Sequence, residues 1–123
     1  MLYNDKVREL FLSPKNLGEI SNADGIGEVG NAKCGDIMKI WIKVVDNKIT
    51  KCMWKTFGCA SAIASTSILS EMVIGMTLDE AYSIKAKDIL DKLGGLPAKK
   101  VHCSVLGDQA LKKAIDNYRN SVS

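Results

Sequence analysis

The fold is decided by residues 37–57, which read IMKIWIKVVDNKITKCMWKTF. Every second residue from Met38 to Val44 is apolar, and two lysines lie on the opposite face. A period of two with β-branched side chains predicts a half-buried strand over Ile37–Val45. Asp46-Asn47 suits a two-residue hairpin turn, because both residues tolerate a positive φ angle. We therefore expect Lys48–Phe57 to return as an antiparallel strand.

The elements on either side of this hairpin complete the fold class. The glycine-rich segment before it predicts a third strand, and apolar residues at helical spacing predict one helix before the strands and several after them. The expected boundaries are a third strand at Ile26–Ala32 and helices at Tyr3–Leu12, Ala60–Gly75, Ile84–Leu93 and Ser104–Tyr118, with a short helix opened by a Thr77–Glu80 capping box. The predicted class is α+β: a three-stranded antiparallel sheet with an N-terminal helix and several C-terminal helices packed on it.

Composition limits the function classes. The chain has 123 residues, which suits a single domain over 1–123. A net charge of +3 gives no strong phosphate-binding field, so we expect no nucleic-acid partner. No apolar run reaches the roughly 18 residues of a membrane span, and the first residues lack a signal-peptide pattern. We therefore expect no membrane association and a cytoplasmic location, where disulfides are disfavoured.

One motif must be set aside. Residues 25–30 read GIGEVG, which matches the dinucleotide-binding string G-x-G-x-x-G. That motif should follow a strand and open a helix whose N-terminus holds a pyrophosphate. Here a strand-like run comes next, so we interpret the glycines as part of an edge strand and loop.

The cysteines carry the chemistry. Cys34, Cys59 and Cys103 each fall at the junction of predicted elements, whereas Cys52 falls within a strand and is expected to be a buried core residue. Asp36 follows Cys34, and His102, the one histidine, precedes Cys103. Helix N-termini lower the pKa of thiols, and thiolates with an imidazole and a carboxylate suit an iron–sulfur cluster or zinc.

These residues leave three hypotheses open. The first is a site for an iron–sulfur cluster. The second is a structural zinc protein with three cysteines and either His102 or Asp36 as ligands. The third is a thiol enzyme that uses Cys103 with His102 as its base, which is disfavoured because adjacent residues at a helix start rarely point at each other.

Several segments resemble the U-type iron–sulfur cluster scaffold proteins, the family of IscU and the NifU N-terminal domain. The matching motifs are collinear from Tyr3 to about Tyr118 and read YNDKV (3–7), PKNLG (14–18), CGDIMK (34–39), KTFGC (55–59), SAIAS (61–65) and HCSVL (102–106). The histidine and the short spacing from Cys59 to Cys103 favour the IscU/NifU type over the SufU type. NifU-type proteins continue beyond this domain, so the chain is either the scaffold alone or part of a longer protein.

The resemblance implies a scaffold rather than an enzyme. Cys34, Asp36, Cys59, His102 and Cys103 match the residues that hold iron and a [2Fe–2S] cluster in the family, and zinc can occupy the same site. A cysteine desulfurase would deliver sulfur as a persulfide, with Cys103 as the first acceptor. The cluster would then pass to apo iron–sulfur proteins.

Two further partners follow from the same resemblance. Tyr3 matches a tyrosine implicated in the pairing of two scaffold molecules, so a homodimer is expected during assembly. The chaperone-recognition stretch departs from the family pattern, because residues 96–100 read LPAKK instead of LPPVK. The lost proline and the added charge argue against binding of a dedicated Hsp70-type chaperone.

Overall fold

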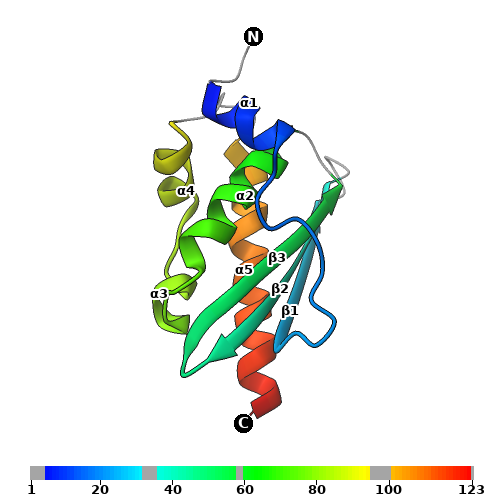
Figure 1. Ribbon diagram of the computed structural model, residues 1–123, viewed down its shortest axis with the longest axis vertical. Coiled ribbons are helices and arrows are strands. Elements are labelled where there is room, and N and C mark those ends of the chain that lie inside the picture. Colours follow the sequence, from blue (N-terminus) through cyan, green and yellow to red (C-terminus); the bar gives the residue numbers. More distant parts are fainter. Residues whose placement is uncertain (1–4, 32–35, 58–59, 95–100, 123) are drawn as a thin grey trace.

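The computed structural model describes residues 5–31, 36–57, 60–94 and 101–122, and within these ranges the side chains at positions 7, 31, 36, 60, 61, 101–105 and 122 lie outside the description. The elements are α1 (Asp5–Leu12), β1 (Gly25–Asn31), β2 (Asp36–Val45), β3 (Lys48–Phe57), α2 (Ala60–Val73), α3 (Leu78–Tyr82), α4 (Ala86–Leu93) and α5 (Val101–Val122). The α+β prediction is confirmed: a three-stranded antiparallel sheet with one helix before it and several after it (Figure 1).

The sheet has the order β1-β2-β3, with the predicted hairpin formed by β2 and β3. Asp46 and Asn47 both have positive φ angles, of 52° and 64°, as a two-residue turn between twisted strands requires. The predicted alternation is also correct, because Met38, Ile40 and Ile42 are fully buried. One face of β2 therefore belongs to the core.

Helices α2 and α5 cover that face. Helix α2 is buried nearly all round, and its small polar side chains bond within the helix: Thr66 donates to the carbonyl of Ala62 at 2.7 Å, and Ser70 to that of Ser67 at 2.7 Å. Small residues let the helix pack closely on its neighbours, and their hydroxyls are satisfied locally, so burying them costs little.

Helix α5 lies directly against the backbone of β1. A side chain added at Gly27 would overlap the backbone of Ala110 and Ala114, and one added at Gly25 would overlap the carbonyl of Ala114. Glycine is required at both positions because the strand and the helix approach backbone to backbone. The G-x-G-x-x-G string is thus an edge strand, as predicted, and its first two glycines serve packing.

The segment between α1 and β1 is anchored beside β3. The indole N–H of Trp54 donates to the carbonyl of Lys15 at 2.8 Å, and its backbone N–H donates to the carbonyl of Asn16 at 3.2 Å. The Asn16 side chain donates to the buried Ser70 hydroxyl at 3.0 Å. This segment therefore ties β3 to α2, and α1 lies across the start of α2 (Figure 1).

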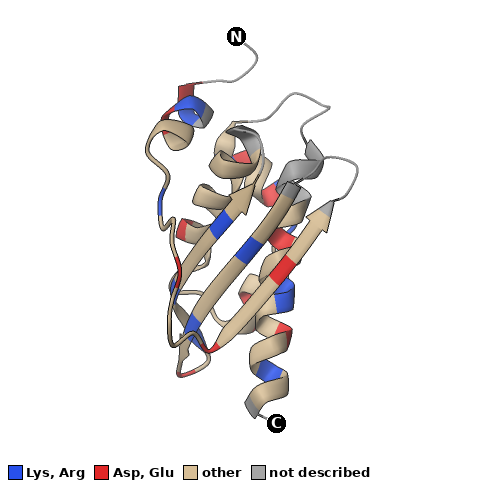
Figure 2. Cartoon of the chain, turned by 90° about the vertical axis from the view of Figure 1, so that its right-hand side faces the viewer, with Lys and Arg blue, Asp and Glu red and all other residues tan. Residues whose placement is uncertain are grey.

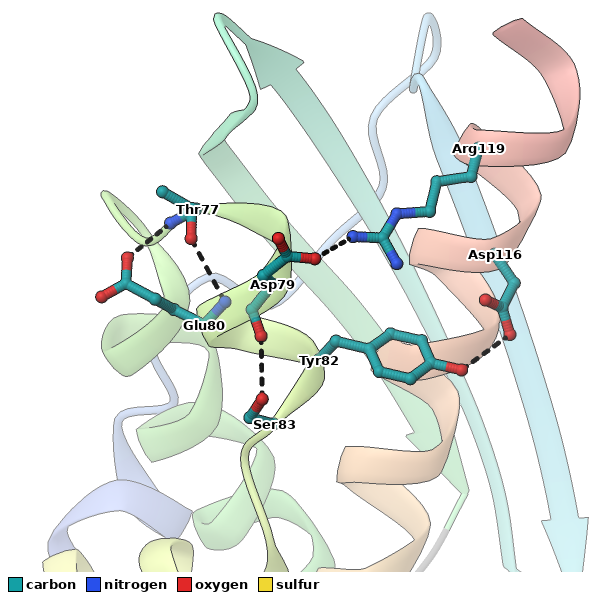
Figure 3. Close-up of polar contacts among 7 residues, drawn as sticks. All are labelled: Thr77, Asp79, Glu80, Tyr82, Ser83, Asp116 and Arg119. Atoms are coloured by element: carbon teal, nitrogen blue, oxygen red, sulfur yellow. Dashed lines mark hydrogen bonds and ion pairs between the residues drawn. The ribbon is translucent and has the colours of Figure 1, made fainter. Parts of the chain in front are cut away.

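A polar contact holds α3 to the C-terminal half of α5 (Figure 3). Arg119 pairs with Asp79 at 2.6 Å, and the Tyr82 hydroxyl donates to Asp116 at 3.3 Å. The predicted capping box is present, since Thr77 accepts from the Glu80 N–H and Glu80 accepts from the Thr77 N–H. Among the described residues, no helix is long and apolar enough to cross a membrane.

Several predicted boundaries need correction. Helix α5 runs from Val101 to Val122, longer at both ends than the predicted Ser104–Tyr118, so His102 and Cys103 lie inside its first turn. Helix α4 begins at Ala86 rather than Ile84, because Lys85 is extended and its N–H bonds to the Asp88 carboxylate at 2.9 Å. Tyr3 and Ala32, where the first helix was predicted to start and the third strand to end, lie outside the described residues.

Candidate functional site at the end of the sheet

The strand register brings one end of each of the three strands to the same edge of the sheet. Asn31, the last residue of β1, pairs with Asp36, the first residue of β2. Ile37 pairs with Phe57, the last residue of β3. Cys34 belongs to the connection between the first two of these ends, and Cys59 is two residues beyond the third. The strand ends nearest to both cysteines in sequence therefore lie at one edge of the sheet.

The start of α5 lies at the same end of the molecule. Gly25 approaches Ala114 and Tyr118, whereas Gly27 approaches Ala110 and Ala114, so a step of two strand residues corresponds to four helix residues. This ratio matches rises of about 3.3 Å per strand residue and 1.5 Å per helix residue. If the same ratio holds over the four strand residues from Gly27 to Asn31, Asn31 lies level with about residue 104 of α5. The first turn of α5, with His102 and Cys103, is therefore level with the strand ends (Figure 1).

One contact in the core shows where α2 lies relative to β2 and α5. Thr66 Oγ1 lies 3.4 Å from Met38 Sδ on β2. A side chain added at Gly107 on α5 would stand 3.5 Å from the same Thr66 oxygen. Thr66 is six residues after the start of α2, Gly107 is six after the start of α5, and Met38 is two after the start of β2. The starts of all three elements are therefore gathered around this contact.

The structure places three of the five predicted ligands at this end, and it does so through the backbone alone. The backbones of Asp36, His102 and Cys103 lie in described elements that start here, and Cys34 and Cys59 lie outside the described residues. Among the side chains that the structure describes, no three His, Cys, Asp or Glu residues form a group able to hold a metal ion. Assignment of the five as ligands stays a prediction.

A groove of about 440 Å³ lies on the sheet. Figure 2 shows the sheet from the face that the helices leave uncovered. The lining residues of the groove come from all three strands and the preceding segment: Leu17, Glu19, Glu28, Ile37, Lys39, Trp41, Lys55, Thr56 and Phe57. Lys55 pairs with Glu19 at 2.8 Å, and this bond lowers the pKa of Glu19. Phe57 is 78% exposed, so the strand next to Cys59 ends in an unburied aromatic ring.

Sequence reasoning missed one buried acid close to the site. Asp108 on α5 is only 6% exposed, and its Oδ1 atom has no hydrogen-bond partner among the described residues. Burial raises the pKa of this carboxyl, and Lys112 opposes the shift. The signal was available, because Asp108 precedes Leu111 and Ile115 by three and seven residues and so shares their buried face.

Cys52 is a core residue, as predicted. Its side chain is 1% exposed, and burial raises the pKa of the thiol to about 12. A thiol held neutral in this way neither attacks sulfur nor binds a metal readily.

A model of the NifU-like N-terminal domain matches residues 2–123. The chain belongs to this family. The iron–sulfur cluster assembly scaffold protein IscU 1 of Archaeoglobus fulgidus is 50% identical over 117 residues, which cover 95% of this chain and 76% of that protein. IscU of Escherichia coli is 46% identical over 124 residues, covering 98% and 96%. The resemblance seen in the motifs is thus confirmed.

Other members of the NifU-like family differ in extent. The nitrogen fixation protein NifU of Nostoc is 53% identical over 125 residues, and these cover 95% of this chain but 42% of that protein. A solved NifU-like N-terminal structure from Brucella abortus has a TM-score of 0.80 with 20% identity, and covers 97% of this chain and 95% of that one. This likeness supports the fold of the family alone.

Proposed function

We propose that this chain is a scaffold on which iron–sulfur clusters are assembled. The observation that carries the proposal is the gathering of β1, β2, β3, α2 and α5 ends at one edge, because these are the ends to which the candidate ligands are adjacent in the sequence. Relatives that are 46–50% identical over nearly the whole chain are named as iron–sulfur cluster assembly scaffolds, which supports the same function. The cluster is the cargo that the protein builds and gives away.

The proposed ligands are the thiolates of Cys34, Cys59 and Cys103, with Asp36 or His102 completing a [2Fe–2S] site. Helix α2 begins directly after Cys59, and Cys103 lies in the first turn of α5. The unpaired N–H groups and the positive dipole end of each helix favour thiolates and donate to sulfur. One hard carboxylate or imidazole in place of a fourth thiolate leaves an exchangeable position on iron.

Sulfur is proposed to enter at Cys103. Its thiolate would attack the terminal sulfur of a persulfide on a cysteine desulfurase, leaving a persulfide on Cys103 and a free thiolate on the donor. Each transferred sulfur then gains two electrons to become sulfide, so an external reductant is required. The donor would dock at the N-terminal segment, the ligand loops and Lys99-Lys100, and the finished cluster would pass to apo-proteins.

Anaerobic reconstitution tests the scaffold function. The protein is mixed with ferrous iron, cysteine, a cysteine desulfurase and dithiothreitol, and its absorption spectrum is followed. A [2Fe–2S] spectrum is expected for the wild type and for Cys52→Ala, and its loss is expected for Ala variants at Cys34, Cys59 and Cys103. A wild-type protein that binds one zinc ion tightly but never develops the spectrum would favour the structural zinc alternative.

The lifetime of the cluster distinguishes the proposed role of Asp36 from that of the thiolates. Asp36→Ala is expected to hold its cluster longer and to transfer it more slowly to an apo-ferredoxin, because the exchangeable oxygen ligand is lost. Decay and transfer are read from the absorption and circular dichroism of the cluster. A cluster that decays faster in Asp36→Ala than in the wild type would remove this role from Asp36.

A further inference from the structure

Two threonines of β3 bridge to β2, one at each half of the strand pair. The Thr56 hydroxyl donates to the carbonyl of Ile37 at 2.6 Å, close to the candidate site. The Thr50 hydroxyl donates to the carbonyl of Lys43 at 3.4 Å, near the hairpin turn. The bond at the site end is therefore short, and its counterpart at the turn end is at the limit of a hydrogen bond.

The Thr56 hydrogen bond lies next to the last strand pair of the ladder, where the side chains are exposed. The last pair of the ladder, Ile37 and Phe57, exposes both side chains, at 46% and 78%. One residue inward, Met38 is fully buried against Thr66. Strand ends with exposed side chains open more easily than buried strand centres. Between the packed Met38 and the end of the sheet, the Thr56 hydroxyl is the side-chain group that the structure shows joining β2 to β3.

This position matters because of its neighbours in the sequence. Ile37 comes directly after Asp36, and Thr56 is three residues before Cys59. We propose that Thr56 is a positioning residue for the metal site: its bond to the Ile37 carbonyl fixes the end of β2 that carries Asp36 against the end of β3 that leads to Cys59. The inference rests on the proposed function, and it assigns to Thr56 no contact with the metal.

The test uses Co²⁺ alone as the probe, because its visible absorption reports ligand type and geometry, and a matched control in the same strand. Thr56→Val removes the bond at the site end, Thr50→Val removes the one at the turn end, and Thr56→Ser restores a hydroxyl. Thr56→Val is expected to weaken Co²⁺ binding about five- to tenfold, as for one lost hydrogen bond, and to shift the d–d bands. Thr50→Val and Thr56→Ser are expected to bind as the wild type does.

Thermal melts of the metal-free proteins accompany the titrations. If the threonine hydroxyls served stability alone, both valine variants would melt at a lower temperature, and their Co²⁺ spectra would be the same. Equal affinities and spectra for Thr56→Val and Thr50→Val overturn the positioning role. A wild type that binds Co²⁺ but assembles no cluster with desulfurase and iron refutes the proposed function instead. The two failures are therefore distinguishable in one set of samples.

Discussion

Replacing Gly27 by alanine tests the close approach of α5 to β1. The added Cβ would overlap the Ala110 carbonyl oxygen and the Ala114 nitrogen, and it would stand 3.0 Å from the Lys113 carbonyl carbon. All three atoms belong to the backbone of α5, so no side chain can rotate away. The strand and the helix would have to separate by roughly 1 Å to reach ordinary van der Waals distances.

The loss in free energy of unfolding caused by Gly27→Ala depends on the apolar surface that α5 buries. Five apolar residues of this helix are nearly or completely buried: Leu106, Ala110, Leu111, Ala114 and Ile115. A gap of 0.5–1 Å forfeits about a quarter to a half of each dispersion contact, and overpacking typically costs about 1–3 kcal/mol or more. Alanine regains about 0.5–1 kcal/mol over glycine within a strand. The net loss in free energy of unfolding is therefore expected near the upper end of the difference, about 2 kcal/mol.

Urea unfolding followed by circular dichroism measures this loss. With an m-value of about 2 kcal/mol per M, the midpoint should fall by about 1 M. The matched control is Gly107→Ala, where the nearest atoms are the side-chain ends Leu69 Cδ2 at 3.3 Å and Thr66 Oγ1 at 3.5 Å. A helical alanine gains about 1 kcal/mol over glycine, so this variant should match or exceed the wild type.

Two results would refute the reasoning. A Gly27→Ala protein within about 0.5 kcal/mol of the wild type would mean that α5 does not lie against β1 as closely as the structure shows. A Gly107→Ala protein as unstable as Gly27→Ala would mean that added volume anywhere on α5 is harmful. Because both proteins are measured without nucleotide, a loss confined to Gly27→Ala also separates a packing role from a dinucleotide site.

Three further predictions concern single residues. Asp108→Asn should raise the free energy of unfolding by about 1 kcal/mol at pH 7, because burial raises the pKa of Asp108 and opposes its charged form. The gain should vanish as the pH falls to the ordinary value of 3.8, where the wild-type carboxyl is increasingly neutral in both states; a gain unchanged between pH 7 and pH 4 contradicts this. Cys52, with its thiol pKa at about 12, should react with a disulfide reagent at least about 100-fold more slowly in the native than in the unfolded protein, measured with the other three cysteines replaced by alanine. Asn16→Ala should lose about 2 kcal/mol, because Asn16 has a φ of 62° and donates to Ser70, whereas Asn16→Gly should lose about 1; equal losses would show that backbone strain is absent.

The hairpin was predictable because its signals are local. Alternation along β2 marks the buried face, and Asp46-Asn47 marks the turn, so both strands could be bounded to within a residue. The capping box at Thr77 is local in the same sense. Features of this kind need no knowledge of what packs on the sheet.

The start of α5 was predicted too late because its first turn lacks strong helix formers. Val101, His102 and Cys103 all have modest intrinsic helix propensity, and the clear helical period of apolar residues in the sequence begins only at Leu106. Tertiary packing against β1 and α2 supplies what propensity does not. Similarly, Gly25 and Gly27 indicate a close approach to the strand, but only the fold shows that α5 makes it.

The sequence predicts which residues are the ligands of the candidate site, and this assignment stays a prediction; the sequence does not show how the surrounding elements are held together. The motifs pointed to Cys34, Asp36, Cys59, His102 and Cys103 because thiolate, carboxylate and imidazole groups suit a labile metal site. The sequence did not indicate Thr56, Thr66 or Asp108, whose relevance arises from hydrogen bonds and burial across elements distant in sequence. Contacts of this kind depend on strand register and helix packing, which no single segment encodes.

The packing of α5 at Gly27 and the Met38–Thr66 contact together determine the relative positions of the elements that carry the candidate ligands. The candidate ligands come from ends of different elements, so their relative positions depend on how those elements are fixed further along. Gly27 fixes α5 against β1, while the Met38–Thr66 contact fixes α2 against β2. A displacement of α5 by roughly 1 Å would therefore move His102 and Cys103 relative to the strand ends. Gly27→Ala should thus weaken Co²⁺ binding even under conditions where the protein remains folded, and Gly107→Ala should not.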